Sequence, residues 1–207
     1  MFLFVFGLSS TSGAALIKQD LSNTGDGLLT LDSTTGLSWL NVSATVNHSY
    51  NDVISGYGGF VNTMGFRYAT IAEVGQLFSE AGVLQTGNWV WGYWNFGNQG
   101  YVANSNLGAL LGVTYPFDGL TAGSYGITGT TSVPGTHEYG LFLYNNHADY
   151  LALQDGGAVD DTYNVSYVGS FLVKDTNAAP VPEPSTELLV GVGMAGIAYF
   201  RKRLQFK

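Results

Sequence analysis

The sequence predicts an α+β fold, followed by a linker and one C-terminal transmembrane helix. Three observations support this prediction. Turn-separated apolar segments indicate antiparallel strands near the start and end of residues 16–178, a capped helix begins at Ile71, and an apolar run with basic residues after it closes the chain. Strands and helices that segregate along a chain are typical of α+β domains rather than of parallel sheets.

Composition narrows the classes of function. The chain has 207 residues, with 7 Lys and Arg against 15 Asp and Glu, and its formal net charge is −8. Between Asp20 and Val173 the only Lys or Arg is Arg67. Nucleic-acid binding needs a basic patch, so we expect none. The absence of cysteine excludes disulfides, thiolate metal sites and cysteine nucleophiles.

The first half of the domain contains the clearest local signals. Residues Leu28–Asp32 and Gly36–Leu40 flank a polar turn and predict a hairpin. A short helix is expected over Ser49–Ser55. A longer helix is predicted over Ile71–Ala81, because Thr70 and Glu73 form a T-x-x-E capping box and Gly82 follows its end.

The second half reads as strands. We expect them at Glu138–Tyr144, Tyr150–Gln154 and Val165–Lys174, joined by turns rich in Asn, Asp and Gly. The Gly-, Thr- and Ser-rich stretch 101–134 has no clear period and stays unassigned. The aromatic segment Trp89–Phe96 admits a core segment or a carbohydrate-binding surface, and the core is favoured.

Few side chains suggest chemistry. Arg67 lies just before the capped helix; a structural ion pair at the helix entry is favoured over a ligand clamp. No G-x-S-x-G elbow, G-x-G-x-x-G loop or P-loop occurs, and we expect no enzyme. Potential metal ligands occur without a known spacing, so no cofactor is expected and Ca²⁺ is kept only as an alternative. These ligands are His137, Glu138, His147, Asp149, Asp155, Asp160 and Asp161.

The N-terminal residues 1–15 predict a signal peptide. Phe2–Leu8 is a short apolar run, and Ser12-Gly13-Ala14 fits the small-x-small rule for cleavage. No Lys or Arg precedes the run, which suggests a natural start further upstream. A buried first strand is the alternative.

The C-terminal residues 179–207 have three ordered parts. Prolines at 180, 182 and 184 favour an extended spacer. The transmembrane helix is expected over residues 187–200, although its uncharged part, Leu188–Phe200, covers only about 20 Å as a helix. Arg201, Lys202 and Arg203 would keep the C-terminus in the cytoplasm by the positive-inside rule.

This tail resembles the PEP-CTERM sorting signal, which has a Pro-Glu-Pro motif, a Gly-rich apolar helix and a basic end. The motif residues are Val181, Pro182, Glu183, Pro184, Ser185 and Thr186, and residues 201–207 form the basic end. Glu187 departs slightly from the family pattern. The resemblance implies an exosortase as processing partner, use of the export machinery, and a Gram-negative bacterium that makes exopolysaccharide.

The domain itself resembles the bacterial C-type-lectin-like domain of unknown function. Thr35-Gly36-Leu37-Ser38-Trp39 matches its T-G-L-x-W hairpin, and residues 65–73 match its W-R-L-P-T-x-x-E helix start, with Phe66 for Trp and Tyr68-Ala69 for Leu-Pro. The resemblance implies long loops and two termini on a shared sheet. No sugar-binding Glu-Pro-Asn or Gln-Pro-Asp tripeptide occurs.

Together these patterns predict a protein that is first anchored in the inner membrane and then reaches the cell surface or the extracellular matrix. A structural or adhesive role in an exopolysaccharide matrix, as in a biofilm, is expected for residues 16–178. The alternative is a lectin-like module that binds carbohydrate or Ca²⁺.

Overall fold

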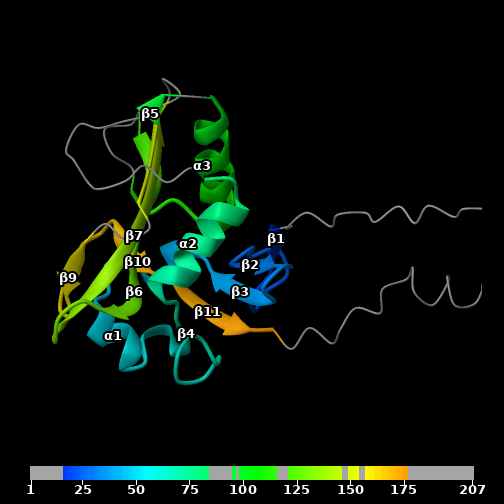
Figure 1. The fold of residues 1–207 in the computed structure, drawn as a ribbon. Coiled ribbons are helices and arrows are strands. Elements are labelled where there is room, and N and C mark those ends of the chain that lie inside the picture. The colour runs from blue at the N-terminus through cyan, green and yellow to red at the C-terminus, as the bar shows by residue number, and fades with distance from the viewer. Residues whose placement is uncertain are drawn as a thin grey trace, which may run out of the picture. The chain divides into compact units, whose positions relative to one another are not determined.

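The computed structural model describes residues 16–83, 95–96, 98–115, 121–145, 149–153 and 157–176. The chain divides into two compact units, Met1–Thr176 and Asn177–Lys207, and all described residues belong to the first. This unit is a mixed α+β structure with two sheets (Figure 1). The predicted signal peptide and the tail from residue 179 lie outside the described residues.

The first sheet joins the two ends of the described domain. Its five strands are β1 (Leu16–Gln19), β2 (Leu29–Asp32), β3 (Leu37–Leu40), β4 (Arg67–Tyr68) and β11 (Leu172–Asp175), and their order is β1-β2-β3-β11-β4. All neighbours in this sheet are antiparallel. The first and last strands of the domain therefore share one sheet, as expected.

The predicted hairpin is confirmed as β2 and β3, with Leu31 opposite Ser38. Asp32 organises the turn, because its carboxylate accepts hydrogen bonds from the amides of Thr34 and Thr35 and from the Thr35 hydroxyl. Gly36 closes the turn with a φ of 72°, a left-handed conformation that glycine adopts at no steric cost.

The second sheet is built around two long strands, β6 (Thr121–Thr131) and β7 (Thr136–Asn145). The order is β10-β6-β7-β8-β5, and β9 also pairs with β7. The other strands are β5 (Asn95–Phe96), β8 (Asp149–Leu153), β9 (Ala158–Asp160) and β10 (Val168–Ser170). The predicted strands at 138–144 and 150–154 are confirmed as β7 and β8, with slightly different ends.

The prediction of one antiparallel strand over Val165–Lys174 is wrong. The segment divides at Phe171 into β10, which runs parallel to β6, and β11, which belongs to the first sheet. Phe171 is fully buried, its amide donates to Ile127 O, and its carbonyl accepts from the Ala69 amide. The backbone of Phe171 thus bonds to Ile127 and Ala69 and belongs to neither β10 nor β11. The chain passes from the second sheet to the first at this residue, although its apolar sequence is continuous.

Two predicted helices are confirmed. They are α1 (Tyr50–Ile54) and α2 (Ile71–Glu80), and each begins with a complete capping box, formed by Ser49 with Asp52 and by Thr70 with Glu73. Two single turns of 3₁₀-helix, η1 (Val42–Thr45) and η2 (Tyr57–Gly59), lie on either side of α1.

A third helix, α3 (Asn98–Leu111), was not predicted. Its sequence is rich in Asn and Gly, which are weak helix formers. Close packing explains the glycines. A Cβ at Gly100 would lie 2.3 Å from the Tyr150 ring, and one at Gly108 would lie 3.0 Å from the Tyr144 hydroxyl. The helix therefore needs glycine to approach the second sheet.

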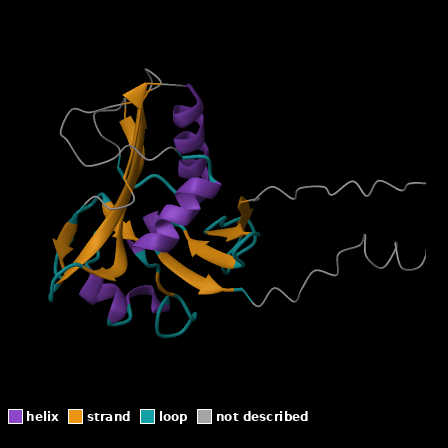
Figure 2. Cartoon of the chain, viewed as in Figure 1, coloured by secondary structure: helices purple, strands orange, loops and turns teal. Residues whose placement is uncertain are grey.

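The main core lies where α2 and α3 pack against strands of both sheets (Figure 2). Phe78 of α2 makes edge-to-face contacts with Phe142 of β7 and with Phe171, and Trp39 of β3 makes another with Phe171. Within the described ranges, no helix is both long and apolar enough to cross a bilayer. The predicted span at residues 187–200 lies outside these ranges.

Candidate functional site

Arg67, Thr70 and Glu73 form one polar cluster at the start of α2. The Arg67 guanidinium donates two hydrogen bonds to the Glu73 carboxylate, at 2.9 Å and 2.7 Å. The same carboxylate accepts from the amide and hydroxyl of Thr70. The hydrogen bond from Arg67 is the largest cause that lowers the pKa of Glu73 to about 2. Arg67 is thus engaged at the helix entry, the arrangement expected of a structural ion pair.

His137 and Asp161 form a second polar pair between β7 and the loop after β9. His137 Nδ1 lies 2.6 Å from Asp161 Oδ1, and the buried imidazole stacks on Tyr50 with ring centroids 3.6 Å apart. Asp161 also holds α1, because its carbonyl accepts from the Asn51 amide at 3.1 Å. The pair therefore links α1 to the second sheet.

The other described carboxylates of the loops are engaged by nearby donors. Asp26 accepts from the amides of Leu21, Ser22, Asn23 and Leu28, and these hydrogen bonds hold its pKa well below the usual range. Asp160 accepts from the amide and hydroxyl of Thr162. In the part of the chain that the structure describes, no three His, Asp or Glu side chains gather as metal ligands would. His147 and Asp155 lie outside that part.

Sequence reasoning missed a cluster of tyrosines on the second sheet. Four segments contribute to it: the residues after α3, the strands β6 and β7, and the loop between β9 and β10. Ring centroids lie 4.3 Å apart for Tyr125 and Tyr139, 4.8 Å for Tyr115 and Tyr167, and 6.4 Å for Tyr125 and Tyr167. Tyr163 joins them through a hydrogen bond with Tyr167. We call these five residues the tyrosine cluster.

The tyrosine cluster is partly exposed and uncharged. All five residues are half-buried, so part of each one reaches the surface. Burial, and then the hydrogen bond with Tyr167, raises the pKa of Tyr163 to about 12. Burial also raises the pKa of Tyr125, and Tyr139 adds to this effect. The hydroxyls of Tyr125 and Tyr163 therefore stay protonated at physiological pH.

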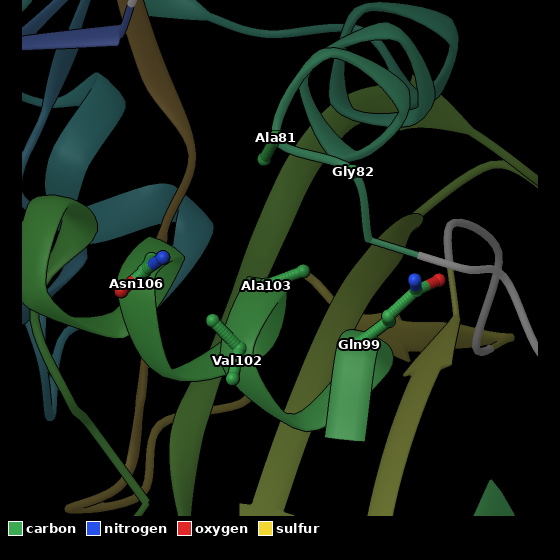
Figure 3. Close-up of a pocket in the computed structure, with 6 residues that line it drawn as sticks. All are labelled: Ala81, Gly82, Gln99, Val102, Ala103 and Asn106. Atoms are coloured by element: carbon green, nitrogen blue, oxygen red, sulfur yellow. The ribbon is translucent and has the colours of Figure 1, made fainter. Parts of the chain in front are cut away.

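A shallow groove of about 460 Å³ lies between the end of α2 and the outer side of α3 (Figure 3). It is lined by Ala81, Gly82, Gln99, Val102, Ala103 and Asn106. Its lining has two amide side chains and no charged one. The groove borders Gly82, beyond which the aromatic segment Trp89–Phe96 lies largely outside the described residues; of that segment, Asn95 and Phe96 form β5.

Comparison with known proteins gives one match. A family model described as the PEP-CTERM protein-sorting motif matches residues 180–203. The chain carries a PEP-CTERM sorting motif. No curated protein and no solved structure matches the chain. The match covers the predicted motif and the three basic residues at 201–203, and all of them lie outside the described residues.

The PEP-CTERM motif identifies the processing partner and the general destination. It supports a protein that is exported, anchored in the membrane before processing, and sorted by an exosortase. The last described residue, Thr176, precedes the matched segment by only a few residues. Its amide and hydroxyl both donate to Gly36 O, which ties the end of the domain to the turn of the β2–β3 hairpin.

Proposed function

We propose that the folded domain is a structural or adhesive component of an exopolysaccharide matrix at the cell surface, and that it is not an enzyme. The PEP-CTERM motif at residues 180–203 is the observation that carries this proposal. Export followed by exosortase processing would deliver the domain to the outside of the cell, where a matrix component has to work.

The domain's surface chemistry agrees with this role. Its described cations are Lys18, Arg67 and Lys174, and Arg67 is engaged by Glu73. Two of the clusters that contain ionisable groups, around Arg67 and around His137, each connect secondary-structure elements. Side chains used in this way stabilise a fold, which a passive matrix component requires.

A lectin-like module that binds carbohydrate is the second candidate. It is supported by the T-G-L-x-W hairpin at residues 35–39 and by the shared sheet of β1 and β11, both of which agree with the C-type-lectin-like resemblance. A role for Ca²⁺ has less support, because the carboxylates of Asp26, Asp160 and Asp161 already accept hydrogen bonds from protein groups.

Fractionation of cells that make the full chain tests the primary proposal. We expect a precursor in the membrane fraction and a shorter form in the extracellular matrix, with a C-terminal peptide that ends near the sorting motif. Deletion of the gene should weaken matrix cohesion in a sedimentation or shear assay. Recovery of intact, folded chains that still end in Lys207 from the cytosol, with unchanged cohesion, would contradict the proposal.

A further inference from the structure

We propose that the tyrosine cluster is a binding site for an uncharged polysaccharide. This inference rests on the proposed function, because it names a ligand class that a matrix component would meet. The site consists of Tyr115, Tyr125, Tyr139, Tyr163 and Tyr167.

The geometry suits sugar rings. Tyr125 and Tyr139 are tilted by 41° to one another, and Tyr115 stands edge-on to Tyr167 at 88°, so the planes of the rings have more than one orientation within the cluster. Each ring has an apolar face beside a polar hydroxyl. Sugars have the same two features, since the C–H groups of a pyranose lie on its faces and its hydroxyls lie around the edge.

Preorganisation favours binding at this site. The rings are held by contacts among themselves and by the apolar side chains beneath them, which include Leu141 and Leu143 against Tyr115 and Tyr125. Hydrogen bonds join the hydroxyls of Tyr125 and Tyr139 and those of Tyr163 and Tyr167. A tyrosine has two side-chain torsions, so little conformational entropy remains to be lost on binding.

The charge of the protein around the tyrosine cluster indicates which class of polysaccharide can bind. The electrostatic neighbours of Tyr125 and Tyr163 are other tyrosines, and two carboxylates precede Tyr163 closely in the sequence: Asp160 at the end of β9 and Asp161 in the loop after it. The chain as a whole has a net charge of −8. An anionic polymer would be repelled by this charge and would find no cation in the cluster. The ligand that fits is therefore a neutral polysaccharide.

Affinity electrophoresis of the full chain in mild detergent tests the site. Native gels would contain a soluble β-glucan, an α-mannan or a galactan, with alginate as the anionic probe. We expect at least one neutral polymer to retard the wild-type chain and alginate to leave its mobility unchanged. Because binding involves no charge, the retardation should be the same at pH 5 and pH 8 and insensitive to salt.

Variants locate the site. Tyr163→Ala and Tyr167→Ala should each weaken the retardation about 2- to 12-fold, the range expected for one aromatic contact. Tyr163→Phe keeps the ring and should retain most of the binding. Tyr57→Ala is the matched control, because Tyr57 is 38% exposed and its ring contacts are with His48 and Phe60. Equal retardation of the wild type and both alanine variants would overturn the inference.

Two outcomes separate this inference from the proposed function. If the wild-type chain reaches the matrix but no neutral polymer retards it, the binding site is refuted while the matrix role stands. If the chain never reaches the matrix, the proposed function fails whatever the gels show. Concentration-dependent dimers that disappear in Tyr163→Ala would identify the cluster as a contact between two copies of the chain, which also refutes the sugar site.

Discussion

The carboxyl groups of Asp32, at the end of β2, and Glu80, at the end of α2, are hydrogen-bonded to each other. Asp32 is 1% exposed, and Glu80 Oε2 is a buried atom that accepts no hydrogen bond from an N–H or hydroxyl group of the described structure. Two carboxyl groups attract each other only when one of them holds a proton. Burial and the neighbouring Asp32 raise the pKa of Glu80, so the proton belongs to Glu80.

Asp32 is the ionised member of this pair. Burial opposes its ionisation, but hydrogen bonds from Thr35, Glu80 and the Thr34 amide outweigh burial and lower its pKa. The pair joins the last turn of α2 to the turn of the β2–β3 hairpin. Its state of protonation therefore affects how firmly the helix and the hairpin are held together.

The variant Glu80→Gln should stabilise the protein at pH 7. The pKa of Glu80 is higher in the folded state than in the unfolded chain, where it is about 4.5. Glu80 therefore stabilises the fold fully at a pH below the unfolded pKa, and this contribution is lost as the pH rises through the folded pKa. Glutamine donates to Asp32 without a charge, so the gain should be below about 1 kcal/mol after solvent screening. Urea unfolding of the full chain at pH 7 and pH 4 measures it, and an equal gain at both values would contradict the assignment.

The variant Glu73→Gln should have the opposite effect. In the wild type, the pKa of Glu73 is lowered to about 2 in the folded state, against about 4.5 in the unfolded chain. The stabilisation that Glu73 gives is therefore present at a pH above 4.5 and is lost as the pH falls through 2. We expect a loss of about 0.5–1 kcal/mol at pH 7, a modest value because the Arg67 side chain is 46% exposed. Urea unfolding at pH 7 and pH 2 measures it. Loss of the same size at pH 2 would show that the ion pair is not its source.

The variant Gly100→Ala should destabilise the protein, although alanine is the better helix former. The added Cβ would overlap the ring of Tyr150, and the overpacking should cost about 1–3 kcal/mol. The control is Asn106→Ala on the exposed side of the same helix, which should gain a few tenths of a kcal/mol. Thermal unfolding compares the two. A stabilised Gly100→Ala variant would mean that α3 does not approach β8 this closely.

The sorting motif gives a prediction about processing. Glu183→Ala, and separately the replacement of Arg201, Lys202 and Arg203 by alanine, should leave an unprocessed precursor or misplace the chain. The mass of the C-terminal peptide and the cell fraction that contains it report the result. Glu187→Ala is the matched control, because Glu187 follows the motif where the family usually continues with apolar residues. Normal processing in both test variants would refute sorting by this motif.

Local signals predicted part of the fold. The β2–β3 hairpin and α2 are fixed by residues close in sequence: the Asp32 turn, Gly36, and the Thr70–Glu73 capping box. Such features can be identified without knowledge of the rest of the chain. The sorting tail was identified in the same way, since its three parts follow one another within residues 180–203.

The sequence did not predict the features that depend on contacts between distant parts of the chain. Helix α3 depends on the contacts of Gly100 with Tyr150 and of Gly108 with Tyr144. These partners lie 50 and 36 residues away in sequence, and no local pattern indicates the contacts. The division at Phe171 depends on pairing with Ala69 and Ile127. The tyrosine cluster gathers residues from four segments, and the only sequence signal for it was the total of 13 tyrosines.

The position of β11 has a mechanical consequence. This last strand lies inside its sheet, with Val173 opposite both Trp39 of β3 and Arg67 of β4. Tension applied to the chain after Thr176 would enter the domain along a strand that is hydrogen-bonded on both sides. Two ladders would have to yield before the strand could peel away, so a surface protein held by this end would resist being pulled apart by flow.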